Sequence, residues 1–185
     1  MNRVRPAIMT DAAAIARIDV ECWQSTYAGV LSDKFLVGLS ENDRKRVWSS
    51  FIGRYPGDMI VSVAPSGEIQ GFGSCGRRRD GDSSFLGEVF TLYVATDHQG
   101  KGIGRALLLG LFTRLVRNSM GSASIWVLRD NPARFFYERL GGKLASHRKL
   151  QVAGVSVEAI AYGWRDLATV LKTQARTGRQ VDGES

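Results

Sequence analysis

Cysteine is scarce in this 185-residue chain, with copies only at Cys22 and Cys75. Two cysteines make neither a disulfide framework nor a zinc site, and neither of them lies in the sequence context of a nucleophile. We therefore expect a protein of the reducing cytoplasm that uses no metal.

Long apolar runs are also absent. No uninterrupted stretch approaches the roughly 20 residues of a membrane-spanning helix, and residues 1–6 lack the apolar core of a signal peptide, so no membrane partner is expected. Hydrophobic residues make up 44% and charged residues 23%, which is typical of a globular protein. The length favours one domain over residues 1–171, followed by a polar tail over 172–185 that we expect to be disordered.

The chain carries a formal net charge of +7, which suits either nucleic acid or a highly anionic small ligand. The one dense basic run, Arg77-Arg78-Arg79, is followed by Asp80-Gly81-Asp82-Ser83-Ser84, a composition that indicates a hairpin loop. No recognition helix, zinc finger or RNA-binding signature is present, so we do not expect a nucleic-acid partner.

The hydrophobic periodicity changes along the chain and predicts an α/β fold. Expected strands span residues 3–8, 59–64, 69–76, 84–94, 122–128, 144–152 and 155–164. Expected helices span 12–23, 32–52 with a break near Ser40, 103–120 and a short segment from Pro132 to Gly141. The order is that of a mixed sheet with helices on its faces.

A glycine-rich loop joins the expected strand 84–94 to the expected helix 103–120. It reads Gln99-Gly100-Lys101-Gly102-Ile103-Gly104-Arg105. The first N–H groups of a helix have no partner within the helix and the helix dipole is positive there, so this loop predicts a phosphate site. No Ser or Thr follows the glycines, which excludes a P-loop, and the dinucleotide fingerprint lacks its third glycine.

The pattern Gln99-x-x-Gly102-x-Gly104 resembles the acyl-CoA pyrophosphate loop of the GCN5-related N-acetyltransferase (GNAT) family. A second segment, from Asn131 to Gly142, is similar to that family's Asn…Ala…Phe-Tyr…Gly-Phe signature, although its alanine comes one position early and Gly142 replaces the final phenylalanine. The order of elements from residue 3 to 165 matches as well. The resemblance implies the GNAT fold, a mixed and mostly antiparallel sheet with helices on both faces, and acetyl-CoA as cosubstrate, bound by residues 99–105.

The same resemblance implies roles for Asn131 and Tyr137. The asparagine is expected to hydrogen-bond the pantetheine arm, and the tyrosine hydroxyl to protonate the CoA thiolate as a general acid. The alternative for Tyr137 is a core aromatic whose hydroxyl satisfies a buried group.

The strand before the loop carries a second candidate group, Glu88. Strict alternation places Glu88, Phe90, Leu92 and Val94 on one face, and a glutamate among apolar neighbours needs a reason. The resemblance implies a general base there, whereas the alternative is a glutamate at the strand edge that faces solvent. It also implies that the backbone of Leu92, Tyr93 and Val94 pairs with the pantetheine amides like an added strand.

A fourth segment contains Trp23 and Tyr27, which resemble the Trp-x-x-x-Tyr-x-Gly stretch of a bacterial GNAT subgroup. They are candidates for the wall of an acceptor pocket, or else core aromatics at helical spacing. The resulting prediction is an N-acetyltransferase for a small amine or amino-acid-like metabolite, by direct attack. A protein lysine or N-terminal acceptor, a non-catalytic acyl-CoA sensor and a homodimer stay open.

Overall fold

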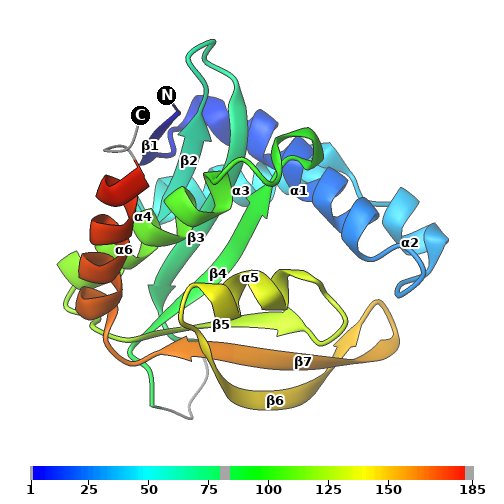
Figure 1. Ribbon diagram of the computed structural model, residues 1–185. Coiled ribbons are helices and arrows are strands. Elements are labelled where there is room, and N and C mark those ends of the chain that lie inside the picture. Colours follow the sequence, from blue (N-terminus) through cyan, green and yellow to red (C-terminus); the bar gives the residue numbers. More distant parts are fainter. Residues whose placement is uncertain (1, 80–83, 182–185) are drawn as a thin grey trace.

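The computed structural model describes residues 2–79 and 84–181, with side chains described up to residue 175. Residues 80–83 of the expected hairpin loop lie outside this part. One seven-stranded sheet runs through the molecule in the order β1-β2-β3-β4-β5-β7-β6 (Figure 1). The strands are β1 (Arg3–Pro6), β2 (Met59–Val63), β3 (Ile69–Arg77), β4 (Gly87–Val94), β5 (Ala123–Leu128), β6 (Lys143–Val152) and β7 (Val155–Trp164).

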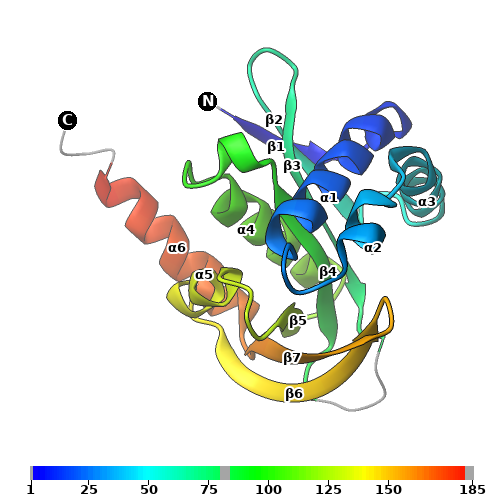
Figure 2. The ribbon, with the colours of Figure 1, turned by 90° about the vertical axis from the view of Figure 1, so that its right-hand side faces the viewer.

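Helices cover both faces of this sheet (Figure 2). One face carries α1 (Ala12–Thr26), α2 (Asp33–Val37) and α3 (Glu41–Arg54). The other carries α4 (Ile103–Arg117), α5 (Ala133–Arg139) and α6 (Leu167–Val181). The predicted α/β class with a mixed, mostly antiparallel sheet is confirmed, because every neighbouring pair is antiparallel except β4 and β5. No helix among the described residues is long and apolar enough to cross a membrane.

The core on the second face is built around α4. Leu107, Leu108, Leu111 and Leu115 are all fully buried there against β3, β4 and β5. This apolar stripe at helical spacing is the reason that the sequence predicts α4 so well.

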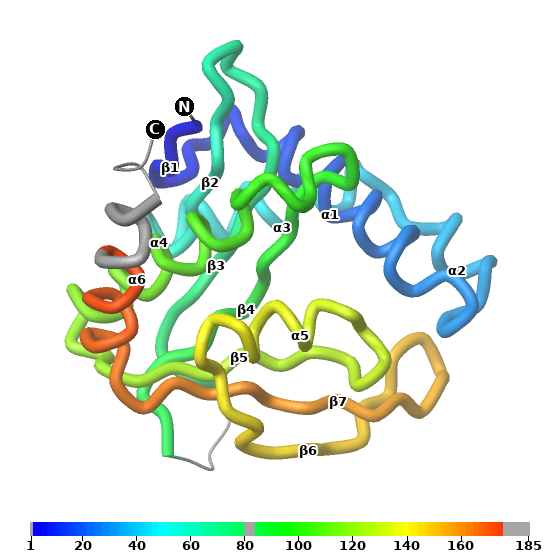
Figure 3. The backbone as a smooth tube through the Cα atoms, viewed as in Figure 1, coloured from blue at the N-terminus to red at the C-terminus, as the bar shows by residue number. Residues whose placement is uncertain are grey.

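β4 and β5 are parallel neighbours for only three residue pairs, from Gly87↔Ala123 to Val89↔Ile125. Beyond Val89 the two strands part, as Figures 1 and 3 show. A β-bulge in β4 lies just beyond this point, since Ser74 pairs with Thr91 while Cys75 pairs with Val89, which leaves Phe90 as the extra residue. The bulge corrects the predicted alternation: Glu88, Phe90 and Tyr93 turn to the α1 and α3 face, while Val89, Leu92 and Val94 pack on the α4 face.

Helix α6 spans Leu167–Val181 and thus enters the segment for which a polar tail is expected. Leu167 is fully buried, and Val170 and Leu171 pack on the α4 core, so the apolar spacing i, i+3, i+4 begins the helix. Residues 182–185 lie outside the described part.

Gly142, which stands where the family signature has an aromatic residue, is explained by Trp164. A Cβ at this position would lie 2.8 Å from Trp164 Cζ2 and 2.9 Å from the Tyr137 carbonyl oxygen. The indole of Trp164 is buried against Phe112, and its Nε1 donates to the Leu140 carbonyl at 2.9 Å. Trp164 therefore supplies from β7 the aromatic packing that a residue at 142 would otherwise provide.

We expect the Gly142→Ala variant to lower the free energy of unfolding by about 1–3 kcal/mol, since the added methyl group overpacks the indole. Gly53→Ala in α3 is the matched control, because nothing lies within 4 Å of a Cβ there and alanine favours a helix. Denaturant unfolding of both variants measures the difference. Equal stability of the two would contradict this account of the Trp164 contact.

Candidate functional site

The parting of β4 and β5 exposes one edge of β4. A Cβ added at Gly71 of β3 would lie 2.8 Å from the Tyr93 carbonyl oxygen, and one added at Gly73 would lie 3.0 Å from the Thr91 carbonyl oxygen. These two carbonyls therefore face β3. Because successive residues of a strand direct their N–H and C=O groups to opposite sides, Leu92 and Val94 direct theirs to the other edge of β4. We call this interruption of strand pairing, where β5 parts from β4 beyond Val89, the cleft. The Val94 carbonyl there accepts from Gln99 Nε2 at 3.1 Å and Cys22 Sγ at 3.4 Å.

The glycine loop lies where β4 leads into α4. A turn of 3₁₀ helix (Thr96–His98) precedes it, and α4 begins at Ile103, whose buried side chain fixes the first turn on the core. Gly100 and Gly102 have φ angles of +74° and +79°, which L side chains rarely adopt. A Cβ at either position would meet no atom within 4 Å. The surface above the loop is therefore open, and the residues present fit a pyrophosphate that approaches the first N–H groups of α4.

The two basic side chains of the loop are engaged elsewhere. Lys101 Nζ donates to the Asp97 carbonyl at 2.8 Å. Arg105 binds Gln174 of α6 through Nε to the side-chain oxygen and through Nη2 to the carbonyl oxygen, both at 2.9 Å. The Arg105 side chain thus ties α6 to the first turn of α4, and the loop offers mainly its backbone to an anion.

Asn131 and Tyr137 lie at the start of α5 and within it. Asn131 Oδ1 accepts the Ala133 N–H at 2.8 Å, which caps α5 and leaves the amide nitrogen for other partners. Tyr137 is buried in a ring cluster with Phe136, Tyr162 and Trp164. Burial, together with the nearby Tyr27, raises the pKa of Tyr137, so this hydroxyl keeps its proton at neutral pH.

Trp23 and Tyr27 of α1 approach the same region from the opposite face. Their ring centroids are 4.9 Å apart, and Tyr27 is buried. Burial raises the pKa of Tyr27, while the Asn131 side chain lowers it in part. Burial also raises the pKa of Tyr93, with Tyr27 and Asp19 adding to the shift. The structure therefore brings Tyr27, Tyr93, Tyr137 and Asn131, from three segments, around the cleft.

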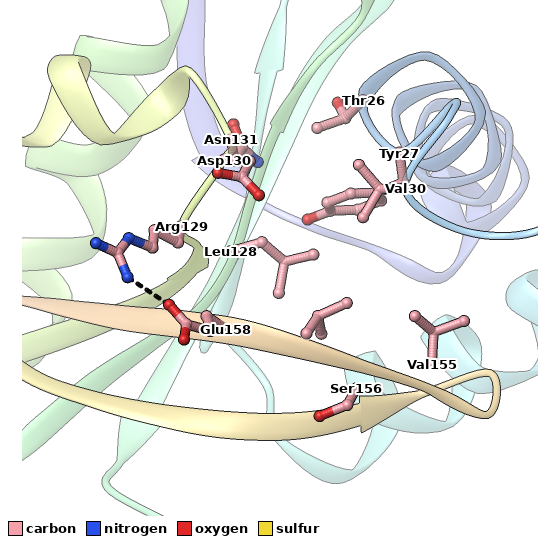
Figure 4. Close-up of a pocket in the computed structure, with 11 residues that line it drawn as sticks. Thr26, Tyr27, Val30, Leu128, Arg129, Asp130, Asn131, Val155, Ser156 and Glu158 are labelled. Carbon is pink, nitrogen blue, oxygen red and sulfur yellow. Dashed lines mark hydrogen bonds and ion pairs between the residues drawn. The ribbon is translucent and has the colours of Figure 1, made fainter.

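A cavity of about 500 Å³ opens beside these residues (Figure 4). It lies between the end of α1, the loop from β5 to α5, and the tip of the β6–β7 hairpin. Its lining combines apolar and polar side chains. The lining residues are Thr26, Tyr27, Val30, Leu128, Arg129, Asp130, Asn131, Val155, Ser156, Val157 and Glu158. Trp23 does not line this cavity but supports Tyr27.

Glu88 lies at the closed end of the cleft, paired between Gly76 of β3 and Ser124 of β5. It is 2% exposed and does not face solvent. Arg79 holds both carboxylate oxygens, with Nη2 2.5 Å from Oε1 and its backbone N–H 3.2 Å from Oε2. Glu88 does not line the 500 Å³ cavity. A second cavity of about 420 Å³ reaches Arg79 from the α3 side and is lined by Trp48, Phe51, Tyr55, Asp58, Ser74, Gly76, Arg77, Arg79, Phe90 and Thr91.

Two acidic residues of this region are missed by the sequence reasoning. Asp19 of α1 is 1% exposed and accepts from Trp48 Nε1 at 2.8 Å, with Arg44 Nε 3.5 Å away. Burial raises the pKa of Asp19. Asp130 lies in the cavity wall next to Asn131. Asp19 could have been found, because an aspartate in the apolar stripe of an amphipathic helix is unusual. No local sequence feature distinguishes Asp130.

Comparison with known proteins agrees with this geometry. The family model described as the acetyltransferase (GNAT) family matches residues 14–142. The chain belongs to the GNAT family. It is 30% identical over 173 residues to the protein named uncharacterized N-acetyltransferase YuaI of Bacillus subtilis strain 168, covering 94% of this chain and 98% of that protein. It is therefore an acetyltransferase that acts with acetyl-CoA.

Solved structures share the fold. A structure of yncA from Salmonella typhimurium with its cofactor acetyl-CoA has a TM-score of 0.68 at 24% identity and covers 90% of this chain and 94% of that one. The PaiA N-acetyltransferase of Thermoplasma acidophilum in complex with coenzyme A has a TM-score of 0.69 at 19% identity, over 89% and 99% of the two chains. A mycothiol acetyltransferase of Corynebacterium aurimucosum is 37% identical over 65 residues, which are 35% of this chain and 21% of that protein.

The open surface above the glycine loop leads to a binding prediction. We expect Gly102→Glu to weaken CoA binding more than tenfold, because a carboxylate would occupy the space above the loop and repel phosphate. Gly154→Glu in the β6–β7 turn is the matched control, since its φ of +80° and open surroundings give the same backbone cost. Calorimetric titration with CoA measures both variants. Equal affinity of the two variants, with both folded, would refute the assignment of the phosphate loop.

Proposed function

We propose that this acetyltransferase transfers the acetyl group to the primary amine of a small molecule held in the 500 Å³ cavity. The observation that carries the proposal is the meeting of two sets of residues at the cleft between β4 and β5. Asn131 and Tyr27 connect the two sets: both line the cavity, Asn131 lies at the start of α5, and Tyr27 is close enough to Tyr137 to raise its pKa. The cavity is of the size that takes a small ligand.

Donor binding is assigned to backbone groups that have no strand partner where β4 and β5 part, among them the Val94 carbonyl, which Gln99 and Cys22 now hold. We assign the pyrophosphate to the N–H groups from Gly100 to Arg105, and the pantetheine arm to the Asn131 amide and the cleft-facing groups of Leu92 and Val94. The Tyr93 carbonyl faces β3 and its ring packs against Phe72, so we assign Tyr93 the task of holding Leu92 and Val94 in position beside the arm. Acetyl-CoA, when bound, supplies the acetyl group as a thioester that a neutral amine attacks directly.

Proton transfer is assigned to Tyr137 and Glu88. Tyr137 donates its proton to the departing sulfur, a role that its raised pKa suits because the hydroxyl remains protonated at neutral pH. Glu88 accepts the proton of the acceptor ammonium through water, because this carboxylate does not line the 500 Å³ cavity. This second role requires the Arg79 side chain, which is 61% exposed, to release the carboxylate or to let water reach it.

A second candidate function is acetylation of protein amines. A third is an acyl-CoA sensor that binds the cosubstrate without turnover. Release of the CoA thiol from acetyl-CoA across a panel of alkylamines, amino acids, amino-acid amides, aminoglycosides and short peptides separates them. Release with small amines supports the proposal. Release with peptides alone would assign a protein acceptor, and CoA binding without release would assign a sensor. The cytoplasmic location and the homodimer stay predictions.

We expect Tyr137→Phe to lower kcat about 100-fold and to change the affinity for CoA less than twofold, since general-acid catalysis is typically worth 10²–10⁴-fold. The wild-type kcat should not fall as the pH is raised to about 10, because the raised pKa keeps the Tyr137 hydroxyl protonated. Tyr162→Phe is the control, as this ring lies in the same cluster with its hydroxyl on Glu138. A pH–rate profile of each protein tests the role, and an unaltered kcat in Tyr137→Phe would remove this residue from the mechanism.

Glu88 and Arg79 give a paired prediction. Glu88→Gln should lower kcat/KM about 100-fold, because an amide cannot accept the proton. Arg79→Gln keeps the carboxylate and removes only the cation that holds it, so it should lose less activity than Glu88→Gln. Steady-state kinetics of both variants measure the difference, and equal kcat/KM in wild type and Glu88→Gln would rule Glu88 out as the base.

A further inference from the structure

The proposed acceptor cavity carries an unbalanced charge. Its lining includes one cation, Arg129, and two carboxylates, Asp130 and Glu158. Arg129 Nη1 lies 2.5 Å from Glu158 Oε2, and this pairing lowers the pKa of Glu158. Within the part of the chain that the structure describes, no hydrogen bond or ion pair joins the Asp130 carboxylate to another residue. The three charged lining residues therefore sum to −1. Their one cation, Arg129, pairs with Glu158 and also interacts electrostatically with Asp130.

Asp130 lies at the point where donor and acceptor must meet. It directly precedes Asn131, which we assign to the pantetheine arm, and both follow the end of β5. Figure 4 shows the Asp130 carboxylate and the Tyr27 hydroxyl directed toward the same space from the two sides of the cavity, while Arg129 and Glu158 lie together at its rim. Val30, Leu128, Val155 and Val157 supply the apolar remainder of the wall.

We propose that Asp130 selects the acceptor by charge: the substrate is a primary amine with an apolar substituent and no carboxylate on the carbon that bears the amine. The negative side chain attracts the incoming ammonium and repels a carboxylate beside it. Free α-amino acids are thereby disfavoured, and alkylamines, amino-acid amides and similar amines are favoured. Two like charges about 5 Å apart in a partly solvated site reduce binding about tenfold. This inference rests on the proposed function, because it assumes that the cavity holds the acceptor.

The test compares L-leucinamide with L-leucine, which differ in the group beside the amine. For each protein we divide kcat/KM for leucinamide by kcat/KM for leucine. We expect this ratio to be about tenfold lower in Asp130→Asn than in wild type, through changes in the KM for the amine. The intrinsic reactivity of the two amines cancels in this comparison between proteins. The KM for acetyl-CoA should stay the same. Asp33→Asn, the same change of charge at an exposed position of α2 outside the cavity lining, should keep the wild-type ratio.

An unchanged ratio in Asp130→Asn, or the same fall in Asp33→Asn, would overturn the inference. If neither amine leads to release of the CoA thiol from acetyl-CoA, the proposed function fails for these amines. Calorimetric titration of each amine into the protein saturated with CoA then tests whether Asp130 selects by charge. Tighter binding of leucinamide that Asp130→Asn abolishes would support it. No binding of either amine, or a preference that survives in Asp130→Asn, would refute it.

Discussion

The site depends on the parting of β4 and β5 after Val89 and Ile125. A strand in the middle of a sheet normally satisfies the backbone groups of both its edges, and leaving them unpaired away from water is costly. Here the second edge of β4 lacks a strand partner over its last residues while α4 and α5 still cover the sheet. The backbone groups of Leu92 and Val94 are thereby held ready for a ligand that pairs as a strand does. The Val94 carbonyl is satisfied by Gln99 and Cys22, which shows how the protein itself meets this demand.

The bulge at Phe90 determines which side chains reach each face. Without it, alternation would place Glu88 on the same face as Leu92 and Val94, in the core beneath α4. With it, Glu88 turns to the α1 and α3 face, where Arg79 pairs with it and stacks over Phe90 at 4.3 Å. The bulge at Phe90 therefore places Leu92 and Val94 on the α4 face and the Glu88 carboxylate on the opposite face of the sheet. A carboxylate this deeply buried is stable only with such a partner.

Local patterns predicted the parts of the fold that local chemistry determines. The loop from Gln99 to Arg105 and the stripe of leucines in α4 are readable because turn glycines and helical periodicity are short-range features. The partners of Glu88 and Gly142 were not readable, since Arg79 comes from the segment just after β3 and Trp164 from β7, and only the pairing of strands brings them close. The cavity escaped prediction for the same reason: its lining comes from α1, the β5–α5 loop and the β6–β7 hairpin, whose meeting is a property of the whole fold.

The C-terminal helix adds a constraint that the family pattern does not contain. Arg105 follows the last glycine of the loop, where a cation beside phosphate would be expected, yet both of its contacts go to Gln174 of α6. The first turn of α4 is thus tied to α6 by two hydrogen bonds. A restraint of this kind lowers the conformational freedom that a helix end has left to lose when a phosphate binds. The apolar start of α6 at Leu167 and the polar contact at Gln174 act together, because the first packs the helix on the core and the second reaches the loop.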